Sequence, residues 1–371
     1  MPTLKVKPDL QLLIIFLILL VGGLLVLGSA SAVLSQQKIG NPYGFLKHQL
    51  IFGVLPGLLL GFIVYKVPYQ KIQKLSLGLL VVVAIILTAV LIPGLQSRFG
   101  GAGRWISVGW LNFQPSELAK LGLLIYFSSY LAKKNKPKQQ LFVVLAVLGL
   151  VSVLLILQPD LSTLIIIVSS CLAVYFLSGA KISYLLGVFG ACITGLLVLI
   201  YSESYRLDRW RTFLNPAADK VSLGYQINQA LLALGSGGFW GVGLGHSRQK
   251  FNYLPEPMGD SIFAVLGEEL GFLGALVLLT LFVWLLVRAF QISQKANSDF
   301  GRLLSLGIGI WFFLQAFVNI AATCGLLPLA GLPLPFVSYG GSAMMVNLMA
   351  AGLLLNISKH NHHQGIIQKE Y

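Results

Sequence analysis

The sequence predicts an all-α integral membrane protein, a polytopic bundle of about ten transmembrane helices with a large extracytoplasmic loop between the seventh and the eighth. Of its 371 residues, 56% are apolar and only 10% are charged, and the mean hydropathy is +0.83, whereas a soluble domain is about one-quarter charged. The apolar residues form runs of about 20, the length that crosses roughly 30 Å of hydrocarbon. These runs lack the alternation of a barrel strand, so helices are expected, because backbone polar groups in lipid must be paired internally.

The apolar runs place the expected spans in order along the chain. They lie near residues 10–34, 46–65, 75–93, 115–132, 141–158, 161–178, 182–201, 261–287, 303–324 and 339–357. The first run is too long for a signal peptide and has no clear small-residue cleavage site, so it is expected to be retained. We interpret the chain as one membrane domain over 1–371, with the extracytoplasmic loop at 202–260 and a cytoplasmic tail at 358–371.

The distribution of Lys and Arg among the short loops predicts the orientation. With the N-terminus inside, the cytoplasmic segments hold fifteen of these residues, and the short outer loops hold four, Lys38, Lys47, Arg98 and Arg104. Because short cytoplasmic loops are enriched in Lys and Arg, both termini are expected in the cytoplasm. The net charge of +14 is mostly this topology signal, helped by attraction to anionic membrane lipid. No basic stripe with interleaved aromatic residues indicates nucleic-acid binding.

The sequence predicts no dedicated metal or disulfide site. Three cysteines fall in separate predicted spans without ligand or disulfide spacing and are interpreted as small core residues, namely Cys171, Cys192 and Cys324. Three tail histidines could hold a metal, although a solvated tail is the simpler interpretation, namely His360, His362 and His363. The chain contains no P-loop, HExxH or GxSxG motif.

The predicted outer loop 202–260 concentrates cationic side chains before and after a glycine-rich stretch at 235–245. The stretch between residues 224 and 234 is amphipathic enough to lie flat in the membrane interface. Three arginines within six residues at a membrane surface suit a phosphate ligand. A solvated loop, in which acidic residues nearly balance the basic ones, is the alternative. The cationic residues in question are Arg206, Arg209, Arg211, Arg248 and Lys250.

Ionisable residues also occur at or inside the predicted spans. Glu117 and Lys120 are spaced i,i+3 in an apolar helix, so they can share a face and neutralise one another. Intramembrane charge is equally a hypothesis of function, and both interpretations stay open. Arg104 lies beside Trp105 at the outer interface, and Asp160 is expected to cap a helix.

Further acidic residues lie in and directly before the eighth predicted span, and a loop rich in Pro and Gly lies before the last span. Glu268 and Glu269 follow Asp260 by a little over two helical turns, and they either line a cavity or bond to neighbouring helices. Asp260 stands directly before its span, where an N-cap is the structural alternative to a chemical role. The segment 326–341 is rich in Pro and Gly, which predicts a rigid, re-entrant loop on the outer side.

Many of these residues lie in six blocks that, in this order through nearly the whole chain, resemble those of the FtsW/RodA/SpoVE (SEDS) family. The blocks read GAGRWISVGWLNFQPSELAKL, LQPDLST, YRLDRWRTFLNP, GYQINQALLALGSGGFWGVGLGHSRQK, YLPEPMGDSIFAVLGEELG and GLLPLAGLPLPFVSYGGS. The SAS at 29–31 and the VLIPGL before GAGRW are more similar to the FtsW/SpoVE branch than to RodA.

The resemblance implies a peptidoglycan glycosyltransferase that polymerises lipid II into a nascent glycan strand on the outer face of a bacterial cytoplasmic membrane. It also implies a class B penicillin-binding transpeptidase and other divisome proteins as partners, in septum or spore-cortex synthesis. By motif match, Asp260 falls on the family's essential aspartate, and Arg104 and Lys120 fall on positions tied to activity. We therefore expect Asp260 to be catalytic and six residues to bind substrate, namely Arg104, Glu117, Lys120, Arg206, Arg209 and Lys250.

Four positions depart from the family pattern. Met258 and Gly259 stand where His or Gln followed by Thr is common, Ser261 stands where Phe is usual, and Ser162 stands where Gly is usual. Asp260 itself is intact. The departures leave open which groups hydrogen-bond to its carboxylate and set its pKa.

The chemistry that the resemblance implies needs a base and positive charge. The 4-hydroxyl of a GlcNAc attacks the anomeric carbon of a MurNAc, which releases undecaprenyl pyrophosphate. A positioned carboxylate that takes the hydroxyl proton accelerates such a step by ~10²–10⁴-fold. Pyrophosphate is already a good leaving group, so it needs cationic stabilisation more than a second carboxylate. Arg and Lys could supply that charge, and so could Mg²⁺ or Mn²⁺ held by one carboxylate and the pyrophosphate.

Two other classes of function stay open. A flippase for lipid-linked precursors would use the intramembrane charges as its path, although the sequence shows no convincing internal repeat of the kind common in transporters. A non-catalytic scaffold of the division machinery would require neither Asp260 nor the outer cations.

Overall fold

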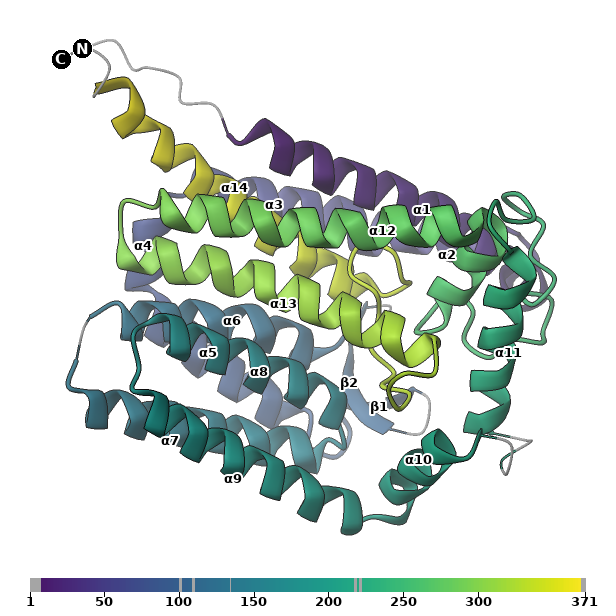
Figure 1. Cartoon of the computed structure of the whole chain (residues 1–371), viewed down its shortest axis with the longest axis horizontal. Helices are drawn as coiled ribbons and strands as arrows, with labels where there is room; N and C mark the ends of the chain where they lie inside the picture. Colours follow the sequence, from purple (N-terminus) through teal and green to yellow (C-terminus); the bar gives the residue numbers. More distant parts are fainter. Residues whose placement is uncertain are drawn as a thin grey trace.

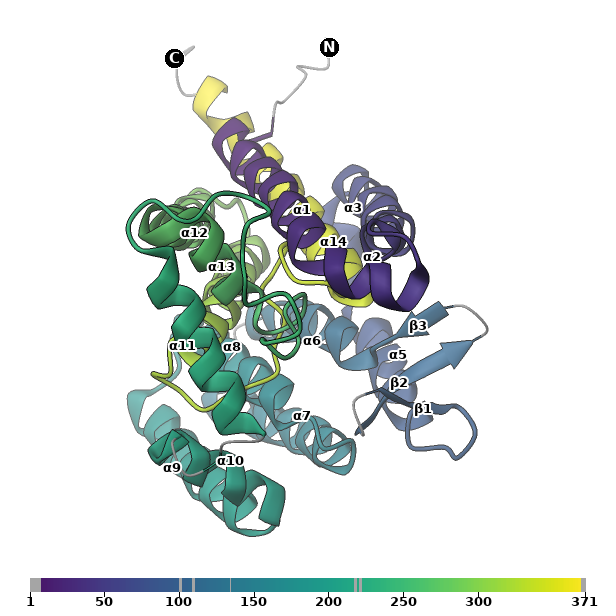
Figure 2. The same cartoon turned by 90° about the vertical axis from the view of Figure 1, so that its right-hand side faces the viewer.

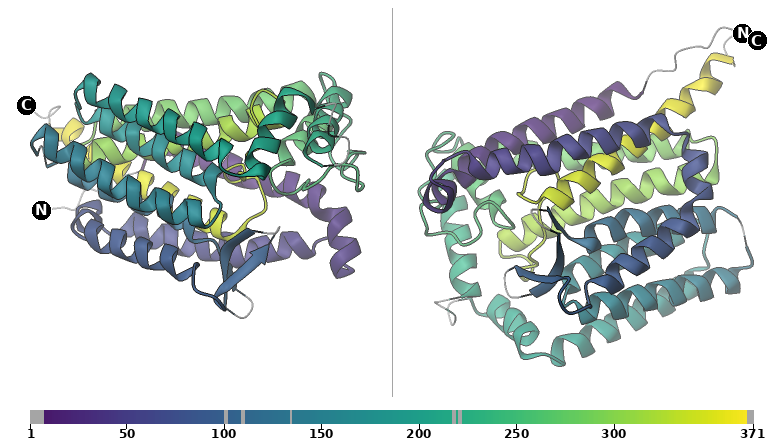
Figure 3. Two further views of the ribbon diagram at one scale, coloured as in Figure 1. Left: turned by 90° about the horizontal axis from the view of Figure 1, so that it is seen from below. Right: turned by 180° about the vertical axis from the view of Figure 1, so that it is seen from behind.

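The computed structural model is a bundle of long helices that run side by side (Figure 1). It describes residues 8–99, 102–108, 111–133, 135–216, 219 and 222–367. The start of α1 (Leu10–Ile39) and the end of α14 (Gly341–Ile367) lie at one end of the bundle. The shorter helices α10 (Ser204–Leu214) and α11 (Leu223–Gly237) lie at the opposite end (Figures 1 and 3). This arrangement agrees with one cytoplasmic end and one outer end.

Each expected span coincides with a helix or with consecutive helical segments. Seven helical stretches of the described chain are long and apolar enough to cross a membrane, and α5 and α8 are apolar but shorter. The positions of the spans are confirmed, whereas ten crossings stay a prediction. After α1 the helices are α2 (Gly44–Gln49), the π-helical η1 (Leu50–Val54), α3 (Leu55–Lys66), α4 (Tyr69–Lys74), α5 (Ser76–Ala89), α6 (Pro115–Leu131), α7 (Pro137–Leu157), α8 (Leu161–Leu177), α9 (Ile182–Tyr201), α12 (Ile262–Gln294) and α13 (Asp299–Thr323).

Local sequence signals account for where several helices begin and end. The side chain of Asp9 accepts a hydrogen bond from the backbone N–H of Leu12 at 2.9 Å and caps α1, as a short polar side chain does at an N-cap. Gly40 ends α1 with φ 73°, a left-handed conformation that glycine adopts without strain. Proline occupies the first turn of α3, α6 and α7, where its missing N–H costs no hydrogen bond.

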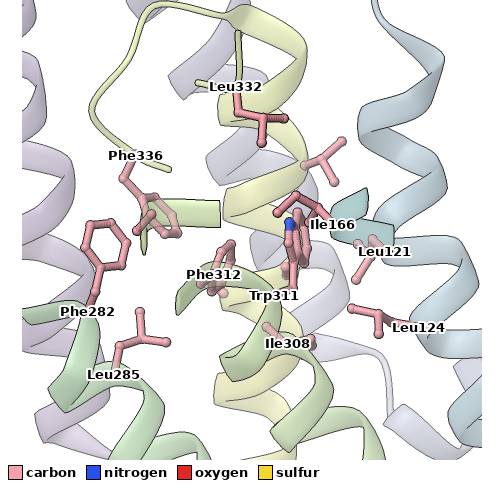
Figure 4. Close-up of a cluster of buried hydrophobic side chains, with 14 of the residues drawn as sticks. Leu121, Leu124, Ile166, Phe282, Leu285, Ile308, Trp311, Phe312, Leu332 and Phe336 are labelled. Carbon is pink, nitrogen blue, oxygen red and sulfur yellow. The ribbon is translucent and has the colours of Figure 1, made fainter. Parts of the chain in front are cut away.

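The core of the bundle is built around α13, which packs against α6, α8 and α12. Trp311 on α13 is fully buried and stacks on Phe312, with their ring centroids 4.9 Å apart. Phe312 in turn meets Phe336, at 5.1 Å, which comes from the segment before α14 (Figure 4). Because lipid is as apolar as these side chains, their close packing rather than their transfer from water holds the helices together.

A small sheet lies between the spans predicted at 75–93 and 115–132, where the sequence predicts only a short outer loop. It has three antiparallel strands, β1 (Gln96–Phe99), β2 (Ala102–Val108) and β3 (Leu111–Phe113), with β2 in the centre (Figure 2). The prediction missed the sheet because its short strands are joined at glycine-rich positions and carry no long apolar pattern. The strands pair their backbone groups with one another. The all-α class is therefore confirmed for the bundle, with this sheet as an addition.

The outer segment 202–260 is more ordered than a long loop. The amphipathic stretch predicted at 224–234 is confirmed as part of α11, which crosses the end of the bundle and contacts α10, α12 and α13 (Figure 1). Its buried residues include Ile227, Ala230 and Ala233, which recur at helical spacing on one face. This face of α11 is therefore covered by protein, whereas Leu231 and Leu232 are 42% and 57% exposed. The expected position of the stretch in the membrane interface stays a prediction.

Helix α12 is interrupted at Gly271, whose φ of 66° and ψ of −166° are not helical. The chain after α11 fills the break, because the backbone N–H groups of Phe272 and Leu273 donate to the carbonyls of Gly238 and Phe239 at 2.9 and 3.3 Å. A Cβ on residue 271 would lie 2.3 Å from the backbone nitrogen of Gly241. Glycine is thus required here for space as well as for conformation.

The segment before α14 is re-entrant, as predicted. Leu332, Leu334, Phe336 and Val337 are buried within the bundle, and a Cβ on Gly23 of α1 would lie 2.3 Å from the carbonyl oxygen of Phe336. Irregular backbone at this depth is tolerated because protein surrounds it.

Candidate active site

Asp260 is held between two helices at the end of the bundle where α10 and α11 lie. From α11, Nε2 of Gln226 donates to Oδ1 of Asp260 at 3.3 Å and to the Ser261 hydroxyl at 2.9 Å. From α13, Nδ2 of Asn319 donates to the backbone carbonyl of Asp260 at 2.9 Å. The N-cap residue of α12 is Ser261, without a side-chain capping bond. The carboxylate of Asp260 is therefore left available, and the capping interpretation is wrong.

A small pocket adjoins the half-buried carboxylate of Asp260. A Cβ on Gly331, which has φ +61°, would lie 4.0 Å from Oδ2 of Asp260. Glycine at this position therefore keeps space open next to the acid. The pocket is lined by Asp260, Asn319, Ala322, Thr323, Leu329, Ala330, Gly331 and Leu332.

The surroundings of Asp260 hold its proton more tightly than water would. Burial, followed by the nearby charge of Glu256, raises the pKa of Asp260 to about 6. Arg209 and the hydrogen bond from Gln226 act in the opposite direction. Desolvation disfavours the charged form of an acid, whereas a cation or a donor favours it. A carboxylate with this pKa is ionised near neutral pH and still a usable base.

One predicted cationic residue, Arg209, interacts with this carboxylate, and a second, Arg104, interacts with Arg209. Burial lowers the pKa of Arg209, the charge of Arg104 lowers it further, and Asp260 raises it. Arg209 also donates to the carbonyl of Leu329, a pocket residue, at 3.4 Å. Arg104, from β2, is only 3.8 Å from a carboxylate oxygen of Asp160. The structure thus brings together a carboxylate and two guanidinium groups from three distant parts of the chain.

Asp160 does more than the predicted capping of α8. Its Oδ1 accepts from the backbone N–H of Thr163 at 3.4 Å, which confirms the cap. Its Oδ2 accepts from the Ser116 hydroxyl at 2.9 Å and from Gln114 at 3.4 Å. Together with Arg104, this aspartate ties α8 and the start of α6 to the sheet.

Glu117 and Lys120 form the ion pair that their spacing predicted. The ammonium of Lys120 lies 2.8 Å from a carboxylate oxygen of Glu117, and both side chains are 1% exposed. Lys120 also donates to Oε1 of Gln315 at 2.8 Å and lies 5.2 Å from the ring centroid of Trp311. The pair is therefore part of a buried network between α6 and α13. Its predicted role in substrate binding stays a prediction.

Lys250 and Arg206 are held by contacts of their own. Lys250 forms a 2.7 Å ion pair with Glu269 and donates to the Ser29 hydroxyl at 2.8 Å. Arg206 donates to the carbonyl of Leu199 at 3.0 Å near the end of α9. These contacts give both cations a structural role, while a role in substrate binding stays a prediction for each.

The open question about Glu268 and Glu269 is settled in favour of bonding. Glu268 accepts from the Ser247 hydroxyl and from the backbone N–H of Arg248, the latter at 2.8 Å. Glu269 accepts from Lys250 and from the Ser29 hydroxyl, the latter at 2.6 Å. Both glutamates thus fix the chain after α11 against α12 and α1.

Sequence reasoning missed Gln226, Asn319 and Gly331. An Asn inside the apolar run of α13 was an available signal, since polar side chains in spans are uncommon. Gln226 and Gly331 carried no such signal, because each is unremarkable until its distance to Asp260 is known.

Within the described ranges, no cluster of three or more His, Cys, Asp or Glu side chains could hold a metal ion. All three cysteines are free. The side chains of the three tail histidines lie outside the described part of the structure.

Comparison with known proteins gives the family. Residues 10–363 match the FtsW/RodA/SpoVE family, described as cell cycle protein. The chain belongs to this family. A probable peptidoglycan glycosyltransferase FtsW of Nitrosomonas europaea is 40% identical over 367 residues, covering 96% of this chain and 94% of that one. Stage V sporulation protein E of Bacillus subtilis is 39% identical over 369 residues, covering 98% of this chain and 100% of that one.

Solved structures of FtsW/RodA/SpoVE relatives have the same fold. A chain from a peptidoglycan synthase complex, solved to explain how polymerisation and crosslinking are coordinated, superposes with a TM-score of 0.80. It is 27% identical, covering 96% of this chain and 99% of that one. The rod shape determining protein RodA of Thermus thermophilus gives a TM-score of 0.72 at 27% identity, covering 96% of this chain and 98% of that one. The family predicted from the sequence blocks is confirmed.

Proposed function

We propose that this chain is a peptidoglycan glycosyltransferase that polymerises lipid II on the outer face of the cytoplasmic membrane, in cell division. Its similarity over nearly the full length to proteins named peptidoglycan glycosyltransferase FtsW supports this activity. The observation that carries the proposal is the carboxylate of Asp260, which stands beside a pocket and interacts with the guanidinium group of Arg209.

In the proposed reaction, Asp260 is the general base. It takes the proton of the acceptor GlcNAc 4-hydroxyl as that oxygen forms a bond to the anomeric carbon of the donor MurNAc. The bond from that carbon to the pyrophosphate oxygen breaks, with inversion, and undecaprenyl pyrophosphate leaves with the electron pair. Attack at the side opposite the leaving group requires only one carboxylate, because the pyrophosphate needs no proton.

Arg209 and Arg104 are the cations best placed to stabilise the departing pyrophosphate. A guanidinium group presents a planar pair of donors that matches phosphate oxygens, and developing negative charge is stabilised best by donors already in position. The electrostatic interactions of Arg209 with both Arg104 and Asp260 support this role. Lys120 and Lys250 have carboxylate partners, so we propose for them an indirect contribution through packing.

The proposed partner is a class B penicillin-binding transpeptidase, which would crosslink the strand that this chain makes. The structural relative from a synthase that coordinates polymerisation and crosslinking supports such a pairing. Other divisome proteins stay a prediction.

Purified protein with lipid II, with and without the cognate transpeptidase, tests the function. We expect glycan strands on gels and by mass spectrometry. Lipid II translocation without glycan would indicate the flippase instead, and neither product nor translocation would indicate the scaffold. A parallel reaction with EDTA tests the Mg²⁺ or Mn²⁺ requirement that the sequence leaves open.

The proposed orientation has its own test. Single cysteines replacing the exposed residues Ser222 and Gln294 in a cysteine-free background mark opposite ends of the bundle. An impermeant maleimide should label Ser222→Cys in spheroplasts and leave Gln294→Cys unlabelled, because of the Lys/Arg bias. Labelling of Gln294→Cys alone would reverse the topology and remove the outer-face site.

A further inference from the structure

Asn319 combines a fixed amide with an unused acceptor in the pocket of Asp260. Its Nδ2 donates to the backbone carbonyl of Asp260 at 2.9 Å and to that of Leu332 at 2.7 Å, so both amide hydrogens are used. Its Oδ1 is buried and has no hydrogen-bond partner in the described structure. The whole side chain is only 3% exposed, and it lines the pocket together with Asp260.

The orientation of this amide is determined by its neighbours. An amide can be rotated so that its oxygen and nitrogen exchange places, and the hydrogen-bond network decides between the two. Rotation of Asn319 would set Oδ1 against the carbonyls of Asp260 and Leu332, which are acceptors themselves. Oδ1 must therefore be the atom without a partner.

A neighbour on the same helix shows how a polar side chain is used when its role is purely structural. Gln315 lies one turn before Asn319, and its Nε2 donates to the carbonyl of Pro333 at 2.7 Å. Its Oε1 accepts from Lys120 and from the Trp311 indole, each at 2.8 Å. Both the nitrogen and the oxygen of the Gln315 amide thus have hydrogen-bond partners, whereas in the Asn319 amide only the nitrogen has them. Buried acceptors without a donor are uncommon. The amide oxygens of Gln158 and Asn347 also lack a donor, but Asn319 differs from them because it lines the pocket of Asp260, where a ligand can supply the donor.

We propose that Oδ1 of Asn319 accepts a hydrogen bond from the acceptor sugar, from the hydroxyl adjacent to the one that Asp260 deprotonates. This inference rests on the proposed glycosyltransferase function. Asp260 and Asn319 line one pocket and are joined through the carbonyl of Asp260, so their free oxygens serve neighbouring groups of one ligand. Vicinal hydroxyls on a hexosamine ring supply two donors at such a spacing, and the ionised carboxylate of Asp260 has no proton to offer.

Asn319 is accordingly a specificity-determining residue for the acceptor. A site built to bond a hydroxyl rejects the analogue that lacks it, because its own polar atom is then left buried and unpaired. The 3-hydroxyl of the terminal GlcNAc is the group concerned, since it adjoins the 4-hydroxyl that attacks.

The test is a single coupling step with separated donor and acceptor. Lipid II blocked at its GlcNAc 4-position serves as donor only, and the acceptor is either normal lipid II or its 3-deoxy-GlcNAc analogue. Because these acceptors can also donate, the measured quantity is the initial rate at which the dimer that carries the blocking group is formed. We expect the wild-type chain to couple the normal acceptor faster by roughly 10–100-fold, the effect of one lost hydrogen bond to a buried acceptor. For Asn319→Leu we expect slower coupling of the normal acceptor, and nearly equal coupling rates for the two acceptors.

Thr323→Val is the matched control. Thr323 lines the same pocket, but its hydroxyl is already used, because it donates to the backbone carbonyl of Asn319 at 2.9 Å. This variant should keep the wild-type ratio. If Asn319→Leu does not fold, as judged by size-exclusion chromatography and thermal melting, Asn319→Ser is measured in the same way.

The possible results separate this inference from the proposed function. Equal coupling of both acceptors by the wild type, or a wild-type ratio in the folded Asn319 variant, overturns the inference while leaving the polymerase intact. In that case Asn319 only holds the backbone carbonyls of Asp260 and Leu332, and its Oδ1 bonds to water. No coupling of either acceptor by the wild type rejects the polymerase itself, and the inference with it.

Discussion

Two groups of acidic residues near the start of α12 have opposite surroundings. Glu268 and Glu269 are each 1% exposed and accept hydrogen bonds from hydroxyl and backbone donors, with the ammonium of Lys250 at 2.7 Å from Glu269. Asp260, a little over two turns earlier, is half-buried, with one side-chain amide donor at 3.3 Å.

The difference indicates that Glu268 and Glu269 stabilise the fold, whereas Asp260 is available for catalysis. A buried charge is tolerated when donors or an opposite charge compensate its lost hydration. Glu269 has the ammonium of Lys250, and Glu268 accepts from the Ser247 hydroxyl and from the backbone N–H groups of Arg248 and Gln249. Asp260 is compensated only in part, so burial raises its pKa to about 6. Perturbed acids beside a pocket are candidates for catalysis, and the contrast with the glutamates makes Asp260 the strongest one here.

Asp260→Asn is the change with the largest expected effect. It keeps the shape of the side chain but removes the proton acceptor, so polymerisation of lipid II should fall by ~10²–10⁴-fold. Expression, melting temperature and transpeptidase binding should match those of the wild type. Substantial glycan synthesis by this variant would remove the catalytic assignment and erase the contrast with the glutamates.

Lys250→Met should affect stability instead of chemistry. It leaves Glu269 buried without its cation, and removing one member of a buried pair costs about 3–5 kcal/mol. Thermal melting in detergent should show the loss, and Lys250→Met combined with Glu269→Leu should recover most of it. A stable single variant that cannot polymerise lipid II would instead place Lys250 in the substrate site, as the sequence suggested.

For the Glu117–Lys120 pair, a double variant distinguishes a role in stability from a role in substrate binding. Lys120→Met alone should lose both stability and polymerisation. Glu117→Gln with Lys120→Met removes both charges and should restore both the melting temperature and polymerisation, because the pair contributes through packing. Polymerisation of lipid II that stays low in this stable double variant would place the ammonium at the substrate. Recovery of both properties would show that the pair is structural.

The smallest expected effect is on the pH profile. Asp260 must be ionised to act as a base, so the rate of glycan synthesis should rise with pH through about 6 and then level off, and one pH unit below that midpoint it should be about tenfold lower. Gln226→Leu removes a donor that lowers the pKa of Asp260. Its profile should therefore shift to higher pH, and an unchanged midpoint would exclude Asp260 as the titrating group.

Features that depend on local spacing were predictable from the sequence. The spans follow from apolar runs, the Glu117–Lys120 pair from an i,i+3 spacing, the Asp160 cap from its place before an apolar run, and α11 from its amphipathic pattern. Asp260 was found through its motif. These signals work because a helix repeats every 3.6 residues, so nearby positions have a known geometry.

The tertiary structure alone decided which distant residues meet. Gln226 reaches Asp260 across 34 positions of sequence, Asn319 across 59, and Lys250 reaches Ser29 across 221. Helical periodicity fixes the face on which a side chain lies, but not which helix packs there or how far it is shifted along its axis. Those choices come from the packing of many side chains at once, and they determine that Glu269 is paired with Lys250 while Asp260 faces a pocket.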